Sequence, residues 1–213
     1  MSSDAATAST FTPAPLDSSK RTWLIASGCA GCVGVVALAT PFVRSFEPSE
    51  LAKAAGGPVE VDISGLKPGE KMIVAWRGKP VWILNRTPEM MDDLKKVDVN
   101  SLADPDSKRT NYSATPEYAC NTARARADRA NLLVMVGICT HLGCSPNDRF
   151  AAGPQPSLPD NWEGGFLCPC HGSKYDLSGR VFKNQPAPDN MQVPPHQYLS
   201  ATRLLIGDDT KKA

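Results

Sequence analysis

Two short stretches of the sequence determine its fold and its chemistry: Cys139-Thr-His-Leu-Gly-Cys144 and, after 23 intervening residues, Cys168-Pro-Cys-His-Gly-Ser173. Together they hold four of the chain's seven cysteines and two of its three histidines. Cysteine thiolates and neutral imidazoles are common ligands of zinc, copper and iron–sulfur clusters. Six such residues exceed the four ligands of one tetrahedral site, so two of them must have another role.

Three arrangements would use these six residues. A structural zinc site would take four of them, although common zinc fingers pair like residues as C-x-x-C and H-x-x-x-H. Two disulfides would take all four cysteines and leave both histidines incidental. An iron–sulfur cluster on two cysteines and two histidines would leave two cysteines to form a disulfide between the loops. Only the third arrangement gives every residue a role.

The third arrangement corresponds to a known family. The motifs C-T-H-L-G-C and C-P-C-H-G-S-x-Y resemble the two boxes of the Rieske iron–sulfur proteins. The form with two additional cysteines resembles the iron–sulfur subunit of bacterial cytochrome bc-type complexes, the ubiquinol–cytochrome c reductases. The resemblance implies one 2Fe–2S cluster on loops 139–144 and 168–175. It also implies two protein ligands for each iron: Cys139 and Cys168 on one, His141 and His171 on the other.

The same resemblance assigns further residues. Cys144 and Cys170 would form a disulfide that links the two loops. Ring-hydroxylating dioxygenases carry similar boxes but usually lack these two cysteines, which favours the quinol-oxidising complexes. The hydroxyls of Ser173 and Tyr175 would donate hydrogen bonds to a bridging sulfur and to the first ligand cysteine, stabilising an added electron. Alternatively, both residues merely begin a strand.

The function implied by the resemblance is electron transfer. Neutral imidazoles make such a cluster less negative, and Rieske centres as a class reach potentials of about −150 to +300 mV. Reduction raises the pKa of the ligand imidazoles, which favours proton uptake at His141 or His171. In the family, the head takes an electron from ubiquinol, here through His171, and passes it to a c-type cytochrome.

Partners follow from the same resemblance. They are the cytochrome b and c-type cytochrome subunits of a translocating oxidoreductase complex, which we expect to be dimeric. Leu142 would be a docking contact with the quinol-site subunit or, alternatively, a simple packing residue.

Two other functions fit parts of the sequence. A Rieske subunit of another exported oxidoreductase, of the arsenite oxidase type, would carry the same boxes, but a long retained anchor and a tether argue against it. A zinc-stapled binding module on a membrane stalk would use the same ligands without redox chemistry. Colour distinguishes the second alternative, because a zinc protein is colourless and a Rieske protein is not.

Several residues outside the boxes also receive an interpretation. Pro186-Ala187-Pro188 resembles the family's proline loop, which covers the cluster, although Gln185 stands where a glycine often precedes it. That difference puts the local turn geometry in doubt. We interpret His196 as an ordinary surface histidine and Cys120 as a free, partly buried thiol.

Composition excludes some classes of protein. The 213 residues carry a formal net charge of +1, and 41% of them are hydrophobic, which suffices for a packed core. No basic stripe with interleaved aromatic residues occurs, so we do not expect a nucleic-acid partner. Seven cysteines are an odd number, so one thiol stays free if the others pair. Cys29 and Cys32 lie in an apolar run and are interpreted as small apolar residues.

One segment near the N-terminus is apolar enough to cross a membrane. Residues 23–40 carry no charge and, with residues 41–43, form a run of 21, enough for a hydrocarbon core of about 30 Å. Lys20 and Arg21 precede it, which predicts a cytoplasmic tail and a periplasmic C-terminal part at the bacterial inner membrane. The tract 19–24 resembles a twin-arginine signal with lysine as the first basic residue. A cleaved signal is the alternative, but the run exceeds a usual h-region and no clear A-x-A site follows.

We therefore expect four parts along the chain. They are a disordered tail (1–18), an export signal and transmembrane anchor (19–43), a flexible tether (44–58) and a periplasmic Rieske domain (59–213). The last should be mainly β, an antiparallel sandwich or barrel with a cluster-binding subdomain.

The elements of that domain can be predicted from local patterns. We expect a helix from about Pro88 to Lys96 with Thr87 as its N-cap, and two-residue turns at Gly78-Lys79 and Ser178-Gly179. Residues 98–130 read as an inserted loop with a short helix near Thr122–Arg129. The predicted strands are Val59–Ile63, Lys71–Arg77, Pro80–Asn85, Leu132–Cys139, Gly165–Cys168, Ser173–Asp176, Val181–Lys183 and Thr202–Ile206.

Overall fold

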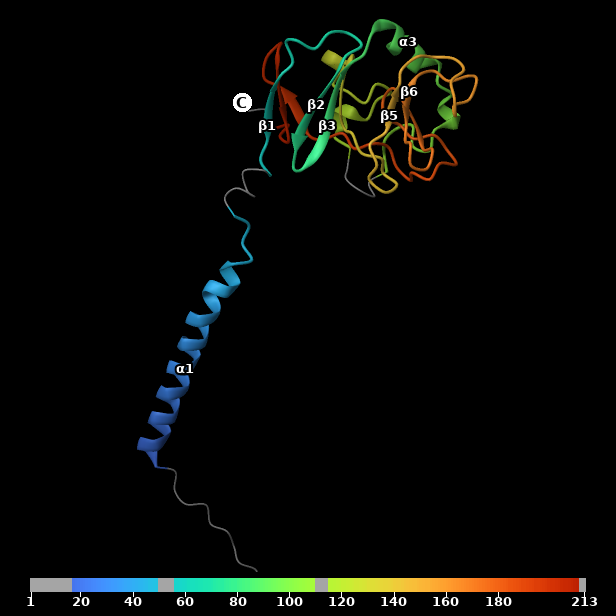
Figure 1. The fold of residues 1–213 in the computed structure, drawn as a ribbon. Helices are drawn as coiled ribbons and strands as arrows, with labels where there is room; N and C mark the ends of the chain where they lie inside the picture. Colours follow the sequence, from blue (N-terminus) through green and yellow to red (C-terminus); the bar gives the residue numbers. More distant parts are fainter. Residues whose placement is uncertain (1–16, 50–55, 110–114, 211–213) are drawn as a thin grey trace, which may run out of the picture. The chain divides into compact units, whose positions relative to one another are not determined.

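The computed structural model describes residues 17–49, 56–109 and 115–210 (Figure 1). The chain forms two compact units, Met1–Leu51 and Ala52–Ala213. Most of the predicted tail and the middle of the predicted tether lie outside the described residues.

The first unit contains the helix α1, Ser18–Arg44, which begins at the N-cap Asp17. The Asp17 carboxylate accepts a hydrogen bond of 3.1 Å from the Ser19 N–H. The polar side chains inside the helix bond to its own backbone, as Thr22 does to Ser18 O and Thr40 to Val36 O. With 27 residues the helix is about 40 Å long, and an 18-residue window within it has a mean hydropathy of 1.8. It is therefore long and apolar enough to span a membrane, a property that an N-terminal signal sequence shares.

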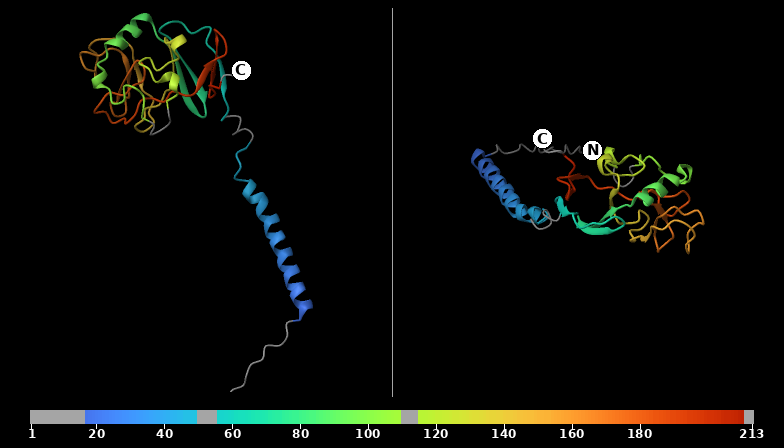
Figure 2. Two further views of the ribbon diagram at one scale, coloured as in Figure 1. Left: turned by 180° about the vertical axis from the view of Figure 1, so that it is seen from behind. Right: turned by 90° about the horizontal axis from the view of Figure 1, so that it is seen from above.

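The second unit consists of three antiparallel sheets of three strands each among its described residues. The first contains β1 (Val59–Asp62), β9 (Arg203–Ile206) and β8 (His196–Tyr198), in that order. The second contains β2 (Lys71–Trp76), β3 (Lys79–Asn85) and β4 (Leu132–Val136). The third contains β5 (Asn147–Arg149), β6 (Gly165–Leu167) and β7 (Lys174–Asp176). Figures 1 and 2 show β1 to β3 at one side of this unit and β5 and β6 at the other. The predicted antiparallel β fold is thus confirmed.

The middle sheet separates two hydrophobic cores. Side chains of a strand alternate between its faces. Val81 and Ile83 of β3 therefore face the first core, which is shared with the first sheet, while Trp82 and Leu84 face the second core on the opposite side. The strand β4 follows the same alternation and is buried throughout. Cys139 and Cys168 lie in the second core, together with residues of the third sheet.

Trp82 joins the second sheet to the third. The centroids of the Trp82 ring and of the Phe166 ring on β6 lie 5.4 Å apart. Lys71 Nζ lies 3.9 Å from the centroid of the Trp82 ring. The same ammonium group is 2.5 Å from Asp148 Oδ1 on β5. A Cβ atom at Gly137 would lie 2.1 Å from the indole, so only glycine allows the chain to pass there. These contacts fix the start of the loop that contains Cys139.

The helix α3, Pro88–Lys96, confirms the prediction from its capping residues. Thr87 Oγ1 accepts a hydrogen bond of 3.2 Å from the Met90 N–H, and Pro88 occupies the first helical position, where its missing N–H costs nothing. Met90 and Leu94, one helical turn apart, are buried in the second core.

The structure corrects several predicted elements. The β2–β3 turn consists of Arg77 and Gly78, with φ of 50° and 72°, and Lys79 already pairs with Trp76. Val181 and Phe182 form only isolated bridges and Lys183 lies in a turn, because the chain there continues into the turns of the proline loop. The short helix expected near Thr122–Arg129 is a single 3-10 turn, Ala127–Arg129. The strands β5 and β8 were not predicted, since three residues are too few to show a period.

Two predictions about burial are wrong. His196 is only 1% exposed; its backbone N–H donates to Tyr118 Oη at 2.8 Å and its Nδ1 lies 2.9 Å from Pro194 O. Burial lowers the pKa of this imidazole to about 4. Cys120 is a free thiol, as predicted, but it is exposed.

Candidate functional site

Each of the two cysteine–histidine loops contains a backbone turn, and the two turns have the same hydrogen bonds. In the first loop, the Cys139 N–H donates to Cys144 O at 2.8 Å and the Gly143 N–H donates to Cys139 O at 3.1 Å. In the second, the Cys168 N–H donates to Ser173 O at 2.8 Å and the Gly172 N–H donates to Cys168 O at 3.0 Å. The pattern therefore repeats after 29 residues.

Glycine is required at the same point of each turn. Gly143 has a φ of +87° and Gly172 a φ of +75°, in the left-handed region that other residues rarely adopt. Nothing lies within 4 Å of a Cβ built at either position, so conformation rather than space selects glycine there.

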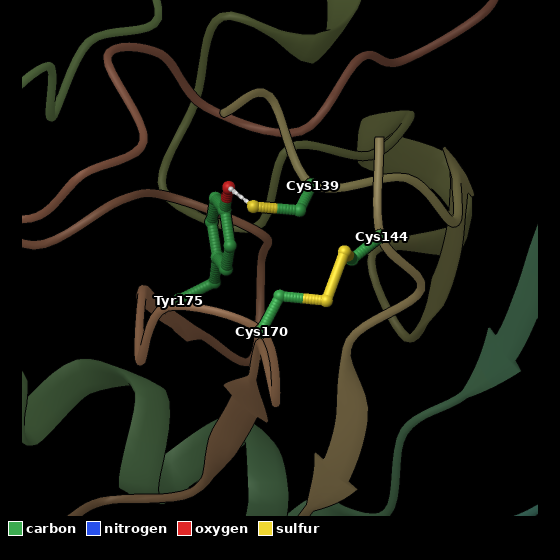
Figure 3. The surroundings of a disulfide bond; sticks show 4 residues. All are labelled: Cys139, Cys144, Cys170 and Tyr175. Atoms are coloured by element: carbon green, nitrogen blue, oxygen red, sulfur yellow. Dashed lines mark hydrogen bonds between the residues drawn. A yellow bond between two sulfur atoms is a disulfide. The ribbon is translucent and has the colours of Figure 1, made fainter. Parts of the chain in front are cut away.

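A disulfide joins the two loops. Cys144 and Cys170 are bonded, with their Cα atoms 6.6 Å apart, as Figure 3 shows. This is the pairing that the family resemblance implied. The bond removes these two sulfurs from the set of metal ligands, since a disulfide sulfur is not a thiolate. Although the sulfurs of Cys144, Cys168 and Cys170 lie within 4.8 Å of one another, this trio is therefore not a ligand set.

The other four box residues form two close pairs. Cys139 and Cys168 are each 2% exposed, and their side chains lie within hydrogen-bonding reach of each other. The rings of His141 and His171 stack edge to face with centroids 4.7 Å apart. His171 is exposed. The described contacts thus form a pair of buried sulfurs and a pair of imidazoles, of which His171 is exposed and His141 is half-buried.

This donor set fits the 2Fe–2S cluster that the sequence implied. The buried Nδ1 of His141 has no hydrogen-bond partner in the described part of the chain, and a buried unpaired nitrogen suits a metal ligand. Burial raises the pKa of the Cys168 thiol, and the adjacent Cys139 raises it further. A bound cation would reverse this and favour both thiolates. Two thiolates and two imidazoles are the ligands of a Rieske-type centre.

Tyr175 reaches the first cysteine from the third sheet. It is fully buried on β7, and its Oη donates a hydrogen bond of 3.2 Å to Cys139 Sγ (Figure 3). The Thr140 N–H donates to the same oxygen at 3.2 Å, while Thr140 Oγ1 donates to Asp189 O at 2.6 Å. Burial raises the pKa of Tyr175, so the phenol keeps its proton. Sequence analysis did not find the part that Thr140 plays in orienting this hydroxyl.

Ser173 ties the second loop to the proline loop. Its hydroxyl oxygen accepts a hydrogen bond of 3.0 Å from the Ala187 N–H, and both residues are buried. Gln185 Oε1 accepts a further bond of 3.2 Å from the Lys174 N–H. The glutamine thus supplies a contact at the position where glycine is frequent. Ala187 of the proline loop lies in the same core as Cys139 and Cys168.

Leu142 lies at the surface of the first loop. Its side chain is 72% exposed, between His141 and Gly143. A cavity of about 320 Å³ opens beside it, lined among others by Val136, Ile138 and Lys79. A large apolar side chain left in water next to an apolar hollow is typical of a contact surface.

Comparisons with known proteins agree with this geometry. Residues 102–195 match the family model of the Rieske [2Fe-2S] domain. The ubiquinol-cytochrome c reductase iron-sulfur subunit of Allochromatium vinosum is 48% identical over 194 residues, which cover 91% of this chain and 90% of that protein. The subunit of the same name from Bradyrhizobium diazoefficiens is 40% identical over 183 residues, 86% of this chain and 90% of that one.

A solved structure adds a looser match. A chain of the "Hyperthermophilic respiratory Complex III" is 26% identical, with 84% of this chain and 97% of that chain covered and a TM-score of 0.42. An overlap of that size supports no argument beyond the sequence comparison. On the strength of the relatives at 40% and 48% identity, the chain belongs to the Rieske [2Fe-2S] proteins and, among them, to the iron–sulfur subunits of ubiquinol–cytochrome c reductase.

Proposed function

We propose that this chain transfers electrons from ubiquinol to a c-type cytochrome through a 2Fe–2S cluster held by Cys139, His141, Cys168 and His171. The observation that carries the proposal is a pair of imidazoles, with ring centroids 4.7 Å apart, on the same two disulfide-linked loops as two buried cysteines. When bound, the cluster supplies a one-electron centre, and its potential depends on the ligands and hydrogen bonds that the chain provides.

The two histidines have the finer role of holding a proton. His171 is exposed, so a quinol hydroxyl can reach its ring, whereas the Nδ1 of His141 is buried. An imidazole bound through one nitrogen keeps the other for a hydrogen bond to substrate. His171 would therefore orient the quinol and take up its proton, coupled to electron uptake.

The partners would be a cytochrome b and a c-type cytochrome in a dimeric complex of the inner membrane. Leu142 would enter the quinol-site subunit, since it is exposed beside an apolar cavity. The helix α1 would anchor the chain in the membrane, with Lys20 and Arg21 on the cytoplasmic side. The β unit would then lie in the periplasm, linked by the tether, whose middle lies outside the described residues.

The test is a redox titration of the full chain in detergent, followed by electron paramagnetic resonance (EPR) at several pH values. We expect a positive midpoint potential that falls as pH rises, because reduction then carries a proton with it. A strongly negative, pH-independent midpoint would leave an iron–sulfur protein without the proposed proton coupling. Zinc on metal analysis, with no EPR signal after reduction, would contradict the whole proposal.

A further inference from the structure

Three arginines are buried in the same unit as the candidate centre. Arg86, Arg124 and Arg180 are each at most 2% exposed, and one carboxylate beside them, Asp176, is fully buried. Only Arg180 pairs with it, through Nε and Oδ2 at 2.6 Å. Arg86 and Arg124 form no ion pair within the described residues. Asp176 lies near both groups and the buried Asp104 lies near Arg124, but neither forms an ion pair with them. Buried charge that no ion pair neutralises is costly, so this arrangement needs a reason.

Backbone carbonyls hold the two unpaired guanidinium groups. Arg86 donates to Leu177 O at 3.1 Å and to Ser178 Oγ at 3.2 Å. Arg124 donates to Ser178 O at 3.1 Å and to Gly179 O at 3.2 Å. Both therefore bind the turn that follows β7. Burial lowers the pKa of each arginine to about 10, which leaves both charged at neutral pH.

This turn is directly connected to the candidate centre. Asp176 follows Tyr175, whose hydroxyl donates to Cys139 Sγ. A Cβ atom at Gly179 would lie 2.8 Å from Met135 Sδ, and Met135 belongs to the same core as Cys139. The turn and the cysteines thus border the same buried apolar core. In such a medium a charge acts over a longer distance than at the surface.

We infer that Arg86 and Arg124 raise the reduction potential of the cluster through buried positive charge that no ion pair neutralises. Positive charge in a low-dielectric core favours the state with one more electron, and burial shields it from salt. The inference rests on the ligand set proposed above. It gives the two arginines a role in tuning the centre and not only in holding a turn.

The competing explanation is structural. Both arginines clamp residues 177–179, next to Tyr175, so their loss would also loosen the hydrogen bond to Cys139 Sγ. The two explanations differ in sign for Asp176. If the electric field of the buried charges matters, removing the negative charge of Asp176 raises the reduction potential. If the turn matters, the same substitution loosens it and lowers the reduction potential, as loss of either arginine would.

The experiment measures midpoint potentials of the full chain by EPR-monitored titration, with cluster content determined in each sample. We expect Arg86→Gln to lower the midpoint potential and Asp176→Asn to raise it. The control is Lys183→Gln, which removes one positive charge, as Arg86→Gln does, but from an exposed side chain; it should leave the midpoint potential unchanged. Shifts in the same direction for Arg86→Gln and Asp176→Asn would overturn the inference. If the wild type shows the EPR signal and every variant has the wild-type midpoint potential, the inference is overturned as well, while the proposed function stays intact.

Two further variants protect the test against failure to fold. If Asp176→Asn takes up no cluster, Arg86→Gln is compared in the wild type and in a Tyr175→Phe background. A field effect gives the same shift in both, whereas a role through Tyr175 disappears in the second. If Arg86→Gln takes up no cluster, Arg124→Gln replaces it. Loss of the cluster from both arginine variants would show that the groups serve folding, and would overturn the inference.

Discussion

Tyr175 Oη and Cys139 Sγ are 3.2 Å apart, although 36 residues separate them in the sequence. The contact joins the last strand of the third sheet to the first cysteine loop (Figure 3). A hydroxyl that donates to a ligand sulfur stabilises the negative charge gained on reduction. With the proposed ligand set, the fold of one sheet would thus contribute to the electron affinity of a centre held by loops.

The first prediction concerns this hydrogen bond. Tyr175→Phe removes the donor and should lower the midpoint potential, with a loss of about 1 kcal/mol in unfolding free energy. Tyr198→Phe is the matched control, because Tyr198 Oη is buried without a hydrogen-bond partner in the described part of the chain. Redox titration of both variants checks the prediction. An equal shift in the two would show that the hydroxyl of Tyr175 has no specific role.

The disulfide between Cys144 and Cys170 should hold the two loops together. Replacing both by serine removes a link that spans 26 residues and should lower the free energy of unfolding by about 3 kcal/mol. We also expect the cluster to be lost faster, which the decay of its visible absorbance would measure. Cys120→Ser, which removes an exposed free thiol, is the control. Equal cluster lifetimes in both variants would argue that the loops stay together without the bond.

His196 should make stability depend on pH. Its pKa is lowered from 6.5 to about 4 in the folded chain, so the unfolded state binds the proton more readily. Its contribution is complete above about pH 6.5 and is lost as pH falls toward 4, by about 2 kcal/mol at pH 5.

The comparison of wild type with His196→Gln isolates this contribution. Denaturant titrations of the full chain in detergent at pH 7 and pH 5 should give a smaller pH effect in the variant. His141 and His171 remain in both proteins, and their contribution cancels. A difference between the two proteins that is the same at both pH values would contradict the assignment.

Gly137 should not tolerate a side chain. In Gly137→Ala the new Cβ atom would lie 2.1 Å from the Trp82 indole, and overpacking of this kind costs about 1–3 kcal/mol. Because Gly137 precedes the first loop by two residues, cluster content should fall as well. Gly65→Ala, where nothing lies within 4 Å of the added atom, is the control. Thermal unfolding and iron analysis of the two variants decide the point.

Leu142 should matter for the complex and not for the fold. Leu142→Asp places a charge on an exposed side chain and should reduce quinol oxidation by the assembled complex at least tenfold, since a charge buried in a contact is costly. The EPR signal and stability should stay unchanged. Leu199→Asp, at a residue 51% exposed on the β8–β9 side, is the control. An equal effect of both substitutions would exclude a specific docking role for Leu142.

Local signals in the sequence were enough for much of the fold. The helix Pro88–Lys96 follows from its N-cap and from apolar residues one turn apart, which act within a few residues. The strands β2, β3 and β4 follow from runs of β-branched and apolar residues. Where local signals were short, prediction failed: the three-residue strands β5 and β8 show no period, and the β2–β3 turn was placed one residue late because Arg77 has a positive φ that its residue type does not favour.

Two spaced motifs in the sequence specify the chemistry of this protein, because their cysteines and histidines restrict the cofactor and their glycines allow the loops to turn. Which distant side chains meet depends on the tertiary structure. Arg86 meets Leu177 across 91 residues, and His196 is buried by Tyr118, 78 residues away. Contacts of this kind depend on how sheets pack, and no pattern within a single segment records which distant segment will cover it.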